Sequence, residues 1–203
     1  DKEPVIFIDS PGVLSTHDKN EVTVKGRVED DSNITSVTVN GEPAKEFDGT
    51  NFTHTLTFED GSQYVTVKAV DEFGNEMEIR RQILVDTKAA TITLVDVPKT
   101  VDLDTDEVEI TFNVKDNFDQ IRVYLYDSEI FANEMSTYSG KSFDQNIKTT
   151  VPVLEEGVNE YKLVVVDLTG HRTELDFTIT KQAAPAPEDG TVLKVKKDSY
   201  SLN

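Results

Sequence analysis

Residues 61–75 read GSQYVTVKAVDEFGN, and residues 157–171 read GVNEYKLVVVDLTGH. The two stretches align without a gap at an offset of 96 residues. Each begins with Gly, continues with apolar residues at alternating positions and ends on an Asp-x-x-Gly turn. Alternation with a period of two is typical of a strand buried on one face. Because the same strand and turn occur twice, the chain is a tandem repeat.

A second pair of stretches defines the start of each copy. Residues 22–30 read VTVKGRVED and residues 108–116 read VEITFNVKD, at an offset of 86 residues. The two offsets differ by ten residues, so the second copy contains an insertion between its two matched stretches. Turn signals such as Asn40-Gly41 and Asp60-Gly61 divide each copy into about seven short strands. About ninety residues in this arrangement predict an immunoglobulin-like (Ig-like) β-sandwich.

The sequence therefore predicts an all-β chain of two tandem Ig-like sandwiches. We expect module 1 over residues 1–87, module 2 over 88–182, a Pro/Ala linker over 183–190, and over 191–203 the first strand of a further module or a strand-exchange segment. Within the insertion, residues 127–138 are predicted to form a short capped helix. Since residue 1 is Asp and no leader precedes it, the chain is expected to be a piece of a longer protein.

Composition excludes several classes of partner. Lys and Arg number 20 against 39 Asp and Glu, which gives a formal net charge of −19. Nucleic acid needs a basic face, so we expect no nucleic-acid partner. No apolar run reaches the ~20 residues of a membrane span, and we expect no membrane insertion. The chain has no Cys, which excludes disulfides and thiol chemistry.

The first copy resembles a known class of module. The stretches VTVKGRV (22–28), VTVNG (37–41) and VDEFGN (70–75) are similar to bacterial Ig-like domains of the glucodextranase-B type. In the second copy the resemblance is weaker, because His171 stands where the first copy has Asn75. Comparable modules follow the catalytic domains of Gram-positive cell-envelope subtilisin-like proteases and occur in S-layer-associated proteins. The resemblance implies an extracellular accessory role at the cell surface.

The sequence offers no recognisable catalytic site, and we predict that the chain is not an enzyme. Its histidines are His17, His54 and His171, and none lies in a nucleophile motif. His54 shares strand parity with Phe52 and Leu56, so we expect a partly buried, hydrogen-bonded side chain. His171 is expected to serve the tight turn in which it lies.

Carboxylates are the candidates for a site, because clusters of oxygen ligands suit Ca²⁺. In this topology the loop after the second strand and the loop before the last strand meet at one pole of a sandwich. We expect a Ca²⁺ site between the modules, held by Asp86, Asp116, Asp119 and Asp167, and a second site in the first copy, held by Asp30, Asp31 and Asp71. The alternative is that these side chains cap turns by accepting backbone N–H groups, which needs no metal.

Two weaker candidates remain. The segment Asp102 to Glu107 imitates half of an EF-hand loop, but Glu107 stands where Gly is needed, which favours a solvated acidic turn. In and beside the insertion lie aromatic side chains that would form a peptide or carbohydrate site if exposed together, or a small core of their own if buried. These are Tyr124, Tyr126, Phe131 and Tyr138.

The leading interpretation is a pair of non-enzymatic spacer modules of an exported surface protein or protease, whose partners are other domains of the same parent chain. One alternative is an adhesin-like module that binds a protein or glycan of the cell wall or surface. The other is a self-assembling component of a surface layer or fibre.

Overall fold

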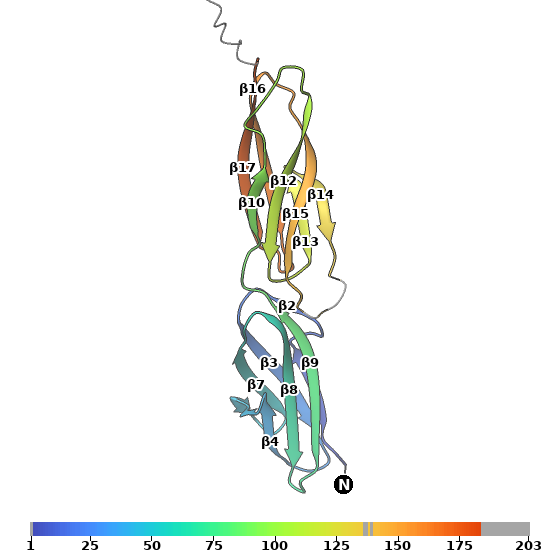
Figure 1. Cartoon of the computed structure of the whole chain (residues 1–203). Helices are drawn as coiled ribbons and strands as arrows, with labels where there is room; N and C mark the ends of the chain where they lie inside the picture. The colour runs from blue at the N-terminus through green and yellow to red at the C-terminus, as the bar shows by residue number, and fades with distance from the viewer. Residues whose placement is uncertain (1, 136–137, 139, 184–203) are drawn as a thin grey trace, which may run out of the picture.

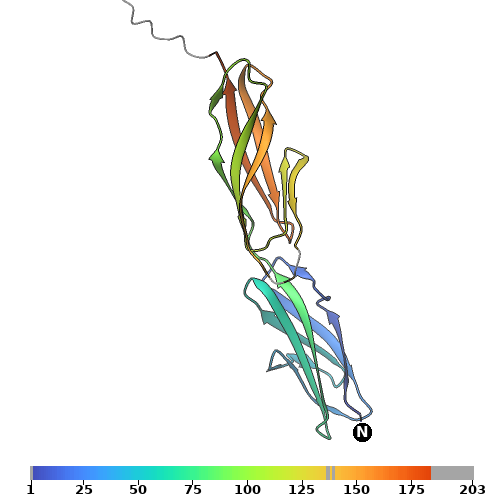
Figure 2. The same cartoon turned by 45° about the vertical axis from the view of Figure 1, so that its right-hand side comes forward.

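A computed structural model describes residues 2–135, 138 and 140–183 of the chain. Two β-sandwiches lie end to end and form an elongated rod (Figures 1 and 2). The chain enters both sandwiches at the same end, which is the lower one in Figure 1. Within the described residues, strands of residues 5–85 share sheets only with one another, and so do those of residues 91–181. We call these two units the first and the second module.

The first module contains nine strands in two sheets, of four and five strands. The four-stranded sheet has the order β1-β3-β7-β6 and the five-stranded sheet the order β2-β9-β8-β4-β5. Their bounds are β1 Val5–Ser10, β2 Thr16–His17, β3 Glu21–Glu29, β4 Ile34–Val39, β5 Glu42–Pro43, β6 Glu46–Phe47, β7 Asn51–Thr57, β8 Gly61–Asp71 and β9 Glu76–Val85.

The second module repeats this plan with eight strands among its described residues. Its sheets have the orders β10-β12-β15 and β11-β17-β16-β13-β14. The bounds are β10 Thr91–Asp96, β11 Thr100–Val101, β12 Glu107–Asp116, β13 Ile121–Leu125, β14 Ser128–Asn133, β15 Phe143–Pro152, β16 Gly157–Val166 and β17 Arg172–Lys181. All-β architecture and two-sheet layering are as the sequence predicts.

The repeated sequence stretches occupy equivalent places in the two modules. Strands β8 and β16 carry them, and both begin at a glycine with positive φ, Gly61 at 128° and Gly157 at 96°. After each strand the turn contains a second such glycine, Gly74 at 86° and Gly170 at 87°. Positive φ is strained for residues with a Cβ, which explains why Gly occupies the last position of each Asp-x-x-Gly turn.

Burial follows the predicted alternation. Along β3, Val22, Val24 and Val28 are at most 3% exposed, while Thr23, Lys25 and Arg27, on the opposite face, are partly or fully exposed. The inner faces of the two sheets form one apolar core in each module. His54 is buried as expected: its Nδ1 accepts a hydrogen bond from the Lys45 N–H at 3.2 Å, and its Nε2 lies 2.9 Å from Glu42.

The helix predicted over residues 127–138 is wrong. Residues 128–133 instead form β14, which pairs antiparallel with β13. Tyr126 adopts a φ of 53° and turns the chain sharply between the two strands. Ile130 and Phe131 of β14 then pack against the core of the second module. The insertion therefore lengthens the edge strand that corresponds to β5 of the first module, because burying two adjacent apolar side chains there outweighs the local helix signals.

Of the predicted C-terminal segments, the linker over 183–190 lies outside the described residues beyond Ala183, and residues 191–203 lie entirely outside them. In the described part of the chain there is no helix with the length and apolar character needed to cross a membrane.

Candidate metal centre

The short link between the modules is held against the second module. Ala90 is 3% exposed and belongs to the second module's core. Its carbonyl oxygen accepts a hydrogen bond from Thr173 Oγ1 at 2.6 Å, and the carbonyl oxygen of Asp86 accepts one from Thr169 Oγ1 at 3.3 Å. Residues 86–90 are therefore fixed at both ends by β17 and the turn before it.

Two of the aspartates predicted to meet at this junction do so. Asp86 is fully buried and Asp167 is 5% exposed. One carboxylate oxygen of each lies within 4.8 Å of the other and of a ring nitrogen of His171. The sequence predicts only a turn role for His171, although its place in the turn that carries Asp167 is a signal that the two side chains lie close together.

Asp167 also caps its turn. Its Oδ1 accepts hydrogen bonds from the N–H groups of Thr169 at 3.0 Å and His171 at 2.8 Å, and its Oδ2 lies 2.9 Å from His171 Nδ1. Asp71 does the same in the first module, where Asn75 supplies both the N–H at 2.7 Å and the side-chain amide at 2.8 Å. His171 thus replaces an amide with a ring that is able to carry charge.

Two carboxylates at the junction, the buried Asp86 and the partly buried Asp116, have strongly raised pKa values. Burial, the charge of Asp86 and, to a smaller extent, that of Asp167 raise the pKa of Asp116 to about 7. Burial and the charge of Asp167 raise the pKa of Asp86 to about 6. His171 has a raised pKa as well: burial works against this, but the hydrogen bond to Asp167 and the charges of Asp167 and Asp86 prevail. Negative charge is therefore concentrated in a place poor in water.

Several buried oxygens at the junction have no hydrogen-bond partner within the described residues. They include Asp86 Oδ2, Asp116 Oδ1 and Asn117 Oδ1, and Asn117 Nδ2 is unpartnered too. Asn117 lies close enough to Asp86 to lower its pKa, but no hydrogen bond of ordinary geometry forms. Asn117 was missed in the sequence analysis, which considered carboxylates only.

Asp119 does not belong to the cluster of Asp86, Asp167 and His171. It is 7% exposed, and its Oδ1 has no partner among the described residues. The residue lines a different pocket of about 430 Å³ together with Asn133, Lys141 and Phe143. Its backbone oxygen accepts a hydrogen bond from Asn133 Nδ2. We therefore leave Asp119 out of the metal set.

The predicted first-copy site is largely a set of turn caps. Asp30 Oδ1 accepts hydrogen bonds from Ser32 N at 2.7 Å and Ser32 Oγ at 2.6 Å, and Ser32 Oγ also lies 3.3 Å from Asp71 Oδ2. Asp31 points outward, with a side chain 81% exposed and 4.0 Å from Lys2 Nζ. Ser32 therefore links Asp30 to Asp71, and Asp31 takes no part.

In the acidic segment Asp102 to Glu107, which resembles half of an EF-hand loop, one carboxylate has a structural role. Asp106 Oδ1 lies 3.0 Å from Nζ of Lys181, whose side chain is only 8% exposed. Asp102 and Asp104 are exposed. An ion pair with a nearly buried Lys accounts for Asp106 without a metal.

The four predicted aromatic site residues do not form one cluster. Phe131 packs against Phe143, with ring centroids 6.0 Å apart. Tyr138, half-exposed, lies near the junction, where its carbonyl oxygen accepts a hydrogen bond from Gln82 Nε2 at 2.6 Å. Tyr124 lies on β13 and is partly buried. Tyr126 borders a pocket.

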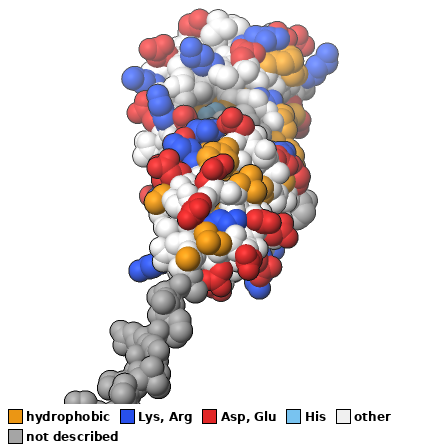
Figure 3. Space-filling view, turned by 90° about the horizontal axis from the view of Figure 1, so that it is seen from above, with side chains coloured by type: hydrophobic (Ala, Val, Ile, Leu, Met, Phe, Trp, Pro, Cys, Tyr) orange, Lys and Arg blue, Asp and Glu red, His pale blue; other side chains and the backbone are white. Residues whose placement is uncertain are grey.

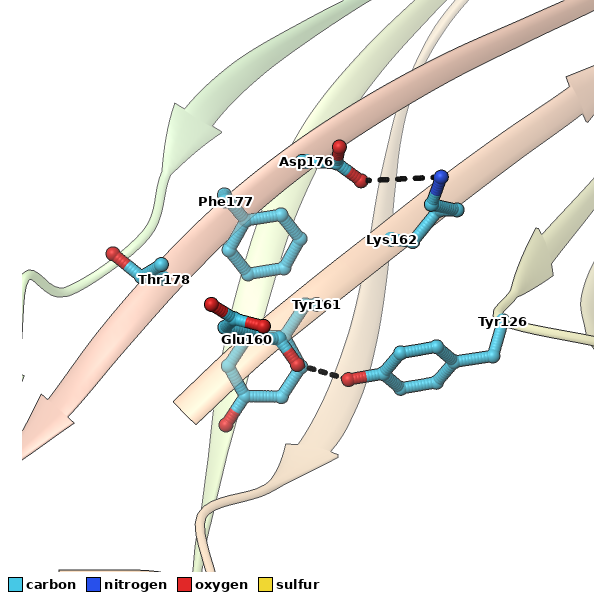
Figure 4. A pocket seen from close by; sticks show the side chains of 7 residues that line it. All are labelled: Tyr126, Glu160, Tyr161, Lys162, Asp176, Phe177 and Thr178. Atoms are coloured by element: carbon cyan, nitrogen blue, oxygen red, sulfur yellow. Dashed lines mark hydrogen bonds and ion pairs between the residues drawn. The ribbon is translucent and has the colours of Figure 1, made fainter. Parts of the chain in front are cut away.

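That pocket has a volume of about 520 Å³ and opens beside β16 and β17 (Figure 4). The Tyr126 hydroxyl donates to the backbone oxygen of Glu160, and Lys162 pairs with Asp176 at 3.7 Å across its rim. Tyr161 and Phe177 stack with centroids 4.9 Å apart and are both less than a tenth exposed. The pocket thus offers polar groups around largely buried rings.

On the face seen from above, acidic side chains lie scattered among Lys, Arg and uncharged side chains rather than in one patch (Figure 3). Most of the ion pairs are exposed, such as Lys148 with Glu109 and Lys68 with Glu76. The buried aspartates of the junction are therefore distinct from this general acidic coat.

Fold and junction together define a tandem pair of Ig-like accessory modules. Residues 4–87 match the family model described as glucodextranase, domain B. The first module is thus an Ig-like module of the glucodextranase-B type, as its motifs indicated.

Solved structures share the architecture. Domains D1–D4 of the ICAM-5 ectodomain align with a TM-score of 0.59 and 8% identity, covering 92% of this chain and 53% of that one. The fibronectin(III)-like modules of Clostridium thermocellum CbhA align with a TM-score of 0.44 and 16% identity, covering 87% and 95% of the two chains. No curated protein matches the chain. At these identities the ICAM-5 match supports the fold alone.

Proposed function

We propose that the two modules form a non-enzymatic spacer that holds the domains on either side of it at a fixed separation and orientation in an exported surface protein. The observation that carries this proposal is the junction, where Asp86 and Ala90 are buried and hydrogen-bonded by the second module. A flexible tether would leave such link residues exposed to water.

The extracellular setting is part of the same proposal. Ig-like modules of this family type and fibronectin-like modules are typical of extracellular proteins, and a Cys-free, strongly acidic chain suits a surface that must stay soluble. Its partners would then be other domains of the parent protein.

Paired spin labels test the spacer directly, because the chain has no Cys of its own. Cysteines introduced at the exposed positions Glu46 and Glu155 carry the labels, one on each module. We expect a narrow distance distribution in the unmodified junction. Inserting Gly-Gly-Ser between Thr87 and Lys88 should broaden it.

The same insertion in the β13–β14 turn, after Asp127, is the matched control and should leave the distribution narrow. If the unmodified junction gives a distribution as broad as that of the Thr87–Lys88 insertion, the spacer proposal is wrong.

A second candidate function, binding of a small polar ligand such as a short glycan, is favoured by the pocket beside Tyr126. Tyr126→Ala should abolish any binding seen on a glycan array while leaving the melting temperature within a few degrees. Tyr124→Ala, a partly buried neighbour on β13, serves as the control for general loss of packing.

A further inference from the structure

We propose that the junction between the modules binds one Ca²⁺-class divalent cation through the carboxylates of Asp86, Asp116 and Asp167 and the side-chain oxygen of Asn117. This deepens the proposed spacer function, because one ligand comes from the link and the others from loops of the second module. A bound cation would tie the link to the second module more strongly than the two threonine hydrogen bonds do.

Buried side-chain oxygens at the junction have no hydrogen-bond partner among the described residues. Asp86 has no exposed surface, and its Oδ1 accepts only a long hydrogen bond of 3.3 Å from Lys88 N. Its Oδ2 is buried without a partner in the described structure, and a carboxylate oxygen of Asp86 lies within 4.8 Å of one of Asp167. An unpaired buried carboxylate oxygen is costly, so its presence indicates a missing ligand.

Asp116 and Asn117 supply further open oxygens from the loop after β12. Asp116 Oδ1 and Asn117 Oδ1 are both buried and without partners among the described residues. Burial and, after it, the charge of Asp86 raise the pKa of Asp116, so the two carboxylates influence each other. The link and the end of β12 thus both carry buried oxygens without a partner among the described residues.

Asp167 is able to join such a site without giving up its turn. A carboxylate has about four acceptor positions. Asp167 uses some of these for the N–H groups of Thr169 and His171 and for the His171 ring, as Asp71 does in the first module. Carboxylates that keep backbone hydrogen bonds while binding metal are fixed in orientation, which favours a defined ion geometry.

The ligand chemistry selects the kind of cation. Carboxylate and amide oxygens suit Ca²⁺ and similar hard ions, and flexible loops suit Ca²⁺ better than Mg²⁺, which demands near-ideal octahedral geometry. His171 already bonds Asp167, with its Nδ1 2.9 Å from Oδ2, so the ring occupies one acceptor position of that carboxylate.

The test is thermal unfolding and titration calorimetry of the full chain, treated with EDTA and then exchanged into CaCl₂. We expect one Ca²⁺ per chain, with an affinity in the 10⁻⁴–10⁻³ M range known for extracellular modules. The melting midpoint should rise by on the order of 10 °C at about 100 times the Kd. Absence of both heat and shift at 10 mM CaCl₂ would overturn the proposal.

Three variants localise the effect. Asp86→Asn and Asp116→Asn should each weaken Ca²⁺ binding at least tenfold while raising the melting midpoint of the metal-free protein, since each removes a buried charge near others of the same sign. Asp104→Asn removes one exposed acidic charge far from the link in sequence and should change neither quantity. If Asp104→Asn and Asp116→Asn weakened Ca²⁺ binding equally, Ca²⁺ would be attracted by the acidic surface as a whole, and the proposal would be wrong.

The outcomes remain separable from those of the spacer proposal: Ca²⁺ binding with a broad spin-label distribution would defeat only the spacer, and a narrow distribution without Ca²⁺ binding would defeat only this inference.

Discussion

Single aspartates in the Asp-x-x-Gly turns stabilise each module. Asp71 accepts hydrogen bonds from the N–H groups of Phe73 and Asn75 and from the Asn75 side chain. Burial favours protonation of Asp71, but these bonds outweigh it and keep its pKa below the ordinary value.

Asp71→Ala should therefore lower the melting midpoint of the first module by several degrees, because buried N–H groups lose their acceptors. Asp31→Ala, which removes an exposed neighbour, should change it by little. Scanning calorimetry of both variants makes the comparison. Equal effects would show that the turn bonds contribute nothing beyond net charge.

The buried carboxylates of the junction predict an unusual dependence of stability on pH. In the folded protein the pKa of Asp116 rises from 3.8 to about 7 and that of Asp86 to about 6. A raised carboxyl pKa means that the protonated form is favoured by folding. The resulting stability is complete below pH 4 and is lost as pH rises through 6 and 7. His171, whose pKa is also raised by Asp167, changes stability in the same direction.

In EDTA, the junction's contribution to the free energy of unfolding should therefore decline between pH 5 and pH 8. Asp116→Asn should flatten part of this decline, since the titrating group is gone, while Asp104→Asn should preserve it. Urea unfolding of the second module at several pH values measures the trend. A stability that climbs over this range in both the parent chain and Asp116→Asn would contradict the prediction.

At the level of strands, close packing in the first module depends on a glycine in β3. A Cβ on Gly26 would lie 2.2 Å from the Phe7 backbone oxygen and 2.6 Å from Cζ of Phe52, a ring that is 2% exposed. Neither the neighbouring strand β1 nor the core ring has room to move without repacking.

Gly26→Ala should accordingly cost the first module about 1–3 kcal/mol through overpacking. Gly12→Ala is the matched control, because its Cβ would meet nothing closer than 3.9 Å. Denaturant unfolding followed by residue-specific NMR signals assigns the loss to a module. A second module destabilised as much as the first would refute this local explanation.

Strands and turns were readable from the sequence where the chain repeats itself, and less so where it does not. Val22, Val24 and Val28 alternate with polar residues, and that pattern alone places β3 with its buried face. The segment around Ile130 takes the place of the two-residue strand β5 of the first module but does not match it in sequence, and its capping signals suggested a helix. The gain from adding β14 to a sheet edge is a tertiary effect that local propensity does not contain.

The candidate site was partly predictable for the same reason. Asp116 and Asp167 occupy turns matched in the first copy, so the topology brought them to one pole, and Asp86 was close in sequence to the link. Asp119 is close to Asp116 in sequence, but it lines a pocket with Asn133 and Phe143, and such an environment is set by tertiary packing. Asn117 and His171 contribute because of burial and charge, which no spacing rule records.

For the whole molecule, the net charge of −19 is a destabilising term that exposed ion pairs offset only weakly. Lys148 and Glu109, for example, are more than half exposed, and such pairs contribute about 0–1 kcal/mol each. Repulsion among the remaining carboxylates acts over the Debye length, which falls from about 10 Å at 0.1 M salt to about 3 Å at 1 M. Added salt should therefore weaken the repulsion among carboxylates more than it weakens the attraction within exposed ion pairs.

We expect the melting temperature at pH 7, measured in EDTA, to rise when NaCl is increased from 0.02 M to 0.5 M. Near the sequence isoelectric point of about 4.4, where net charge approaches zero, the same salt step should have little effect or a negative one. Scanning calorimetry at both pH values separates screening of net charge from a general effect of salt on apolar burial, which would raise the melting temperature equally at both. A melting temperature that falls with NaCl at pH 7 would mean that specific ion pairs, rather than net repulsion, dominate the electrostatic energy of this acidic rod.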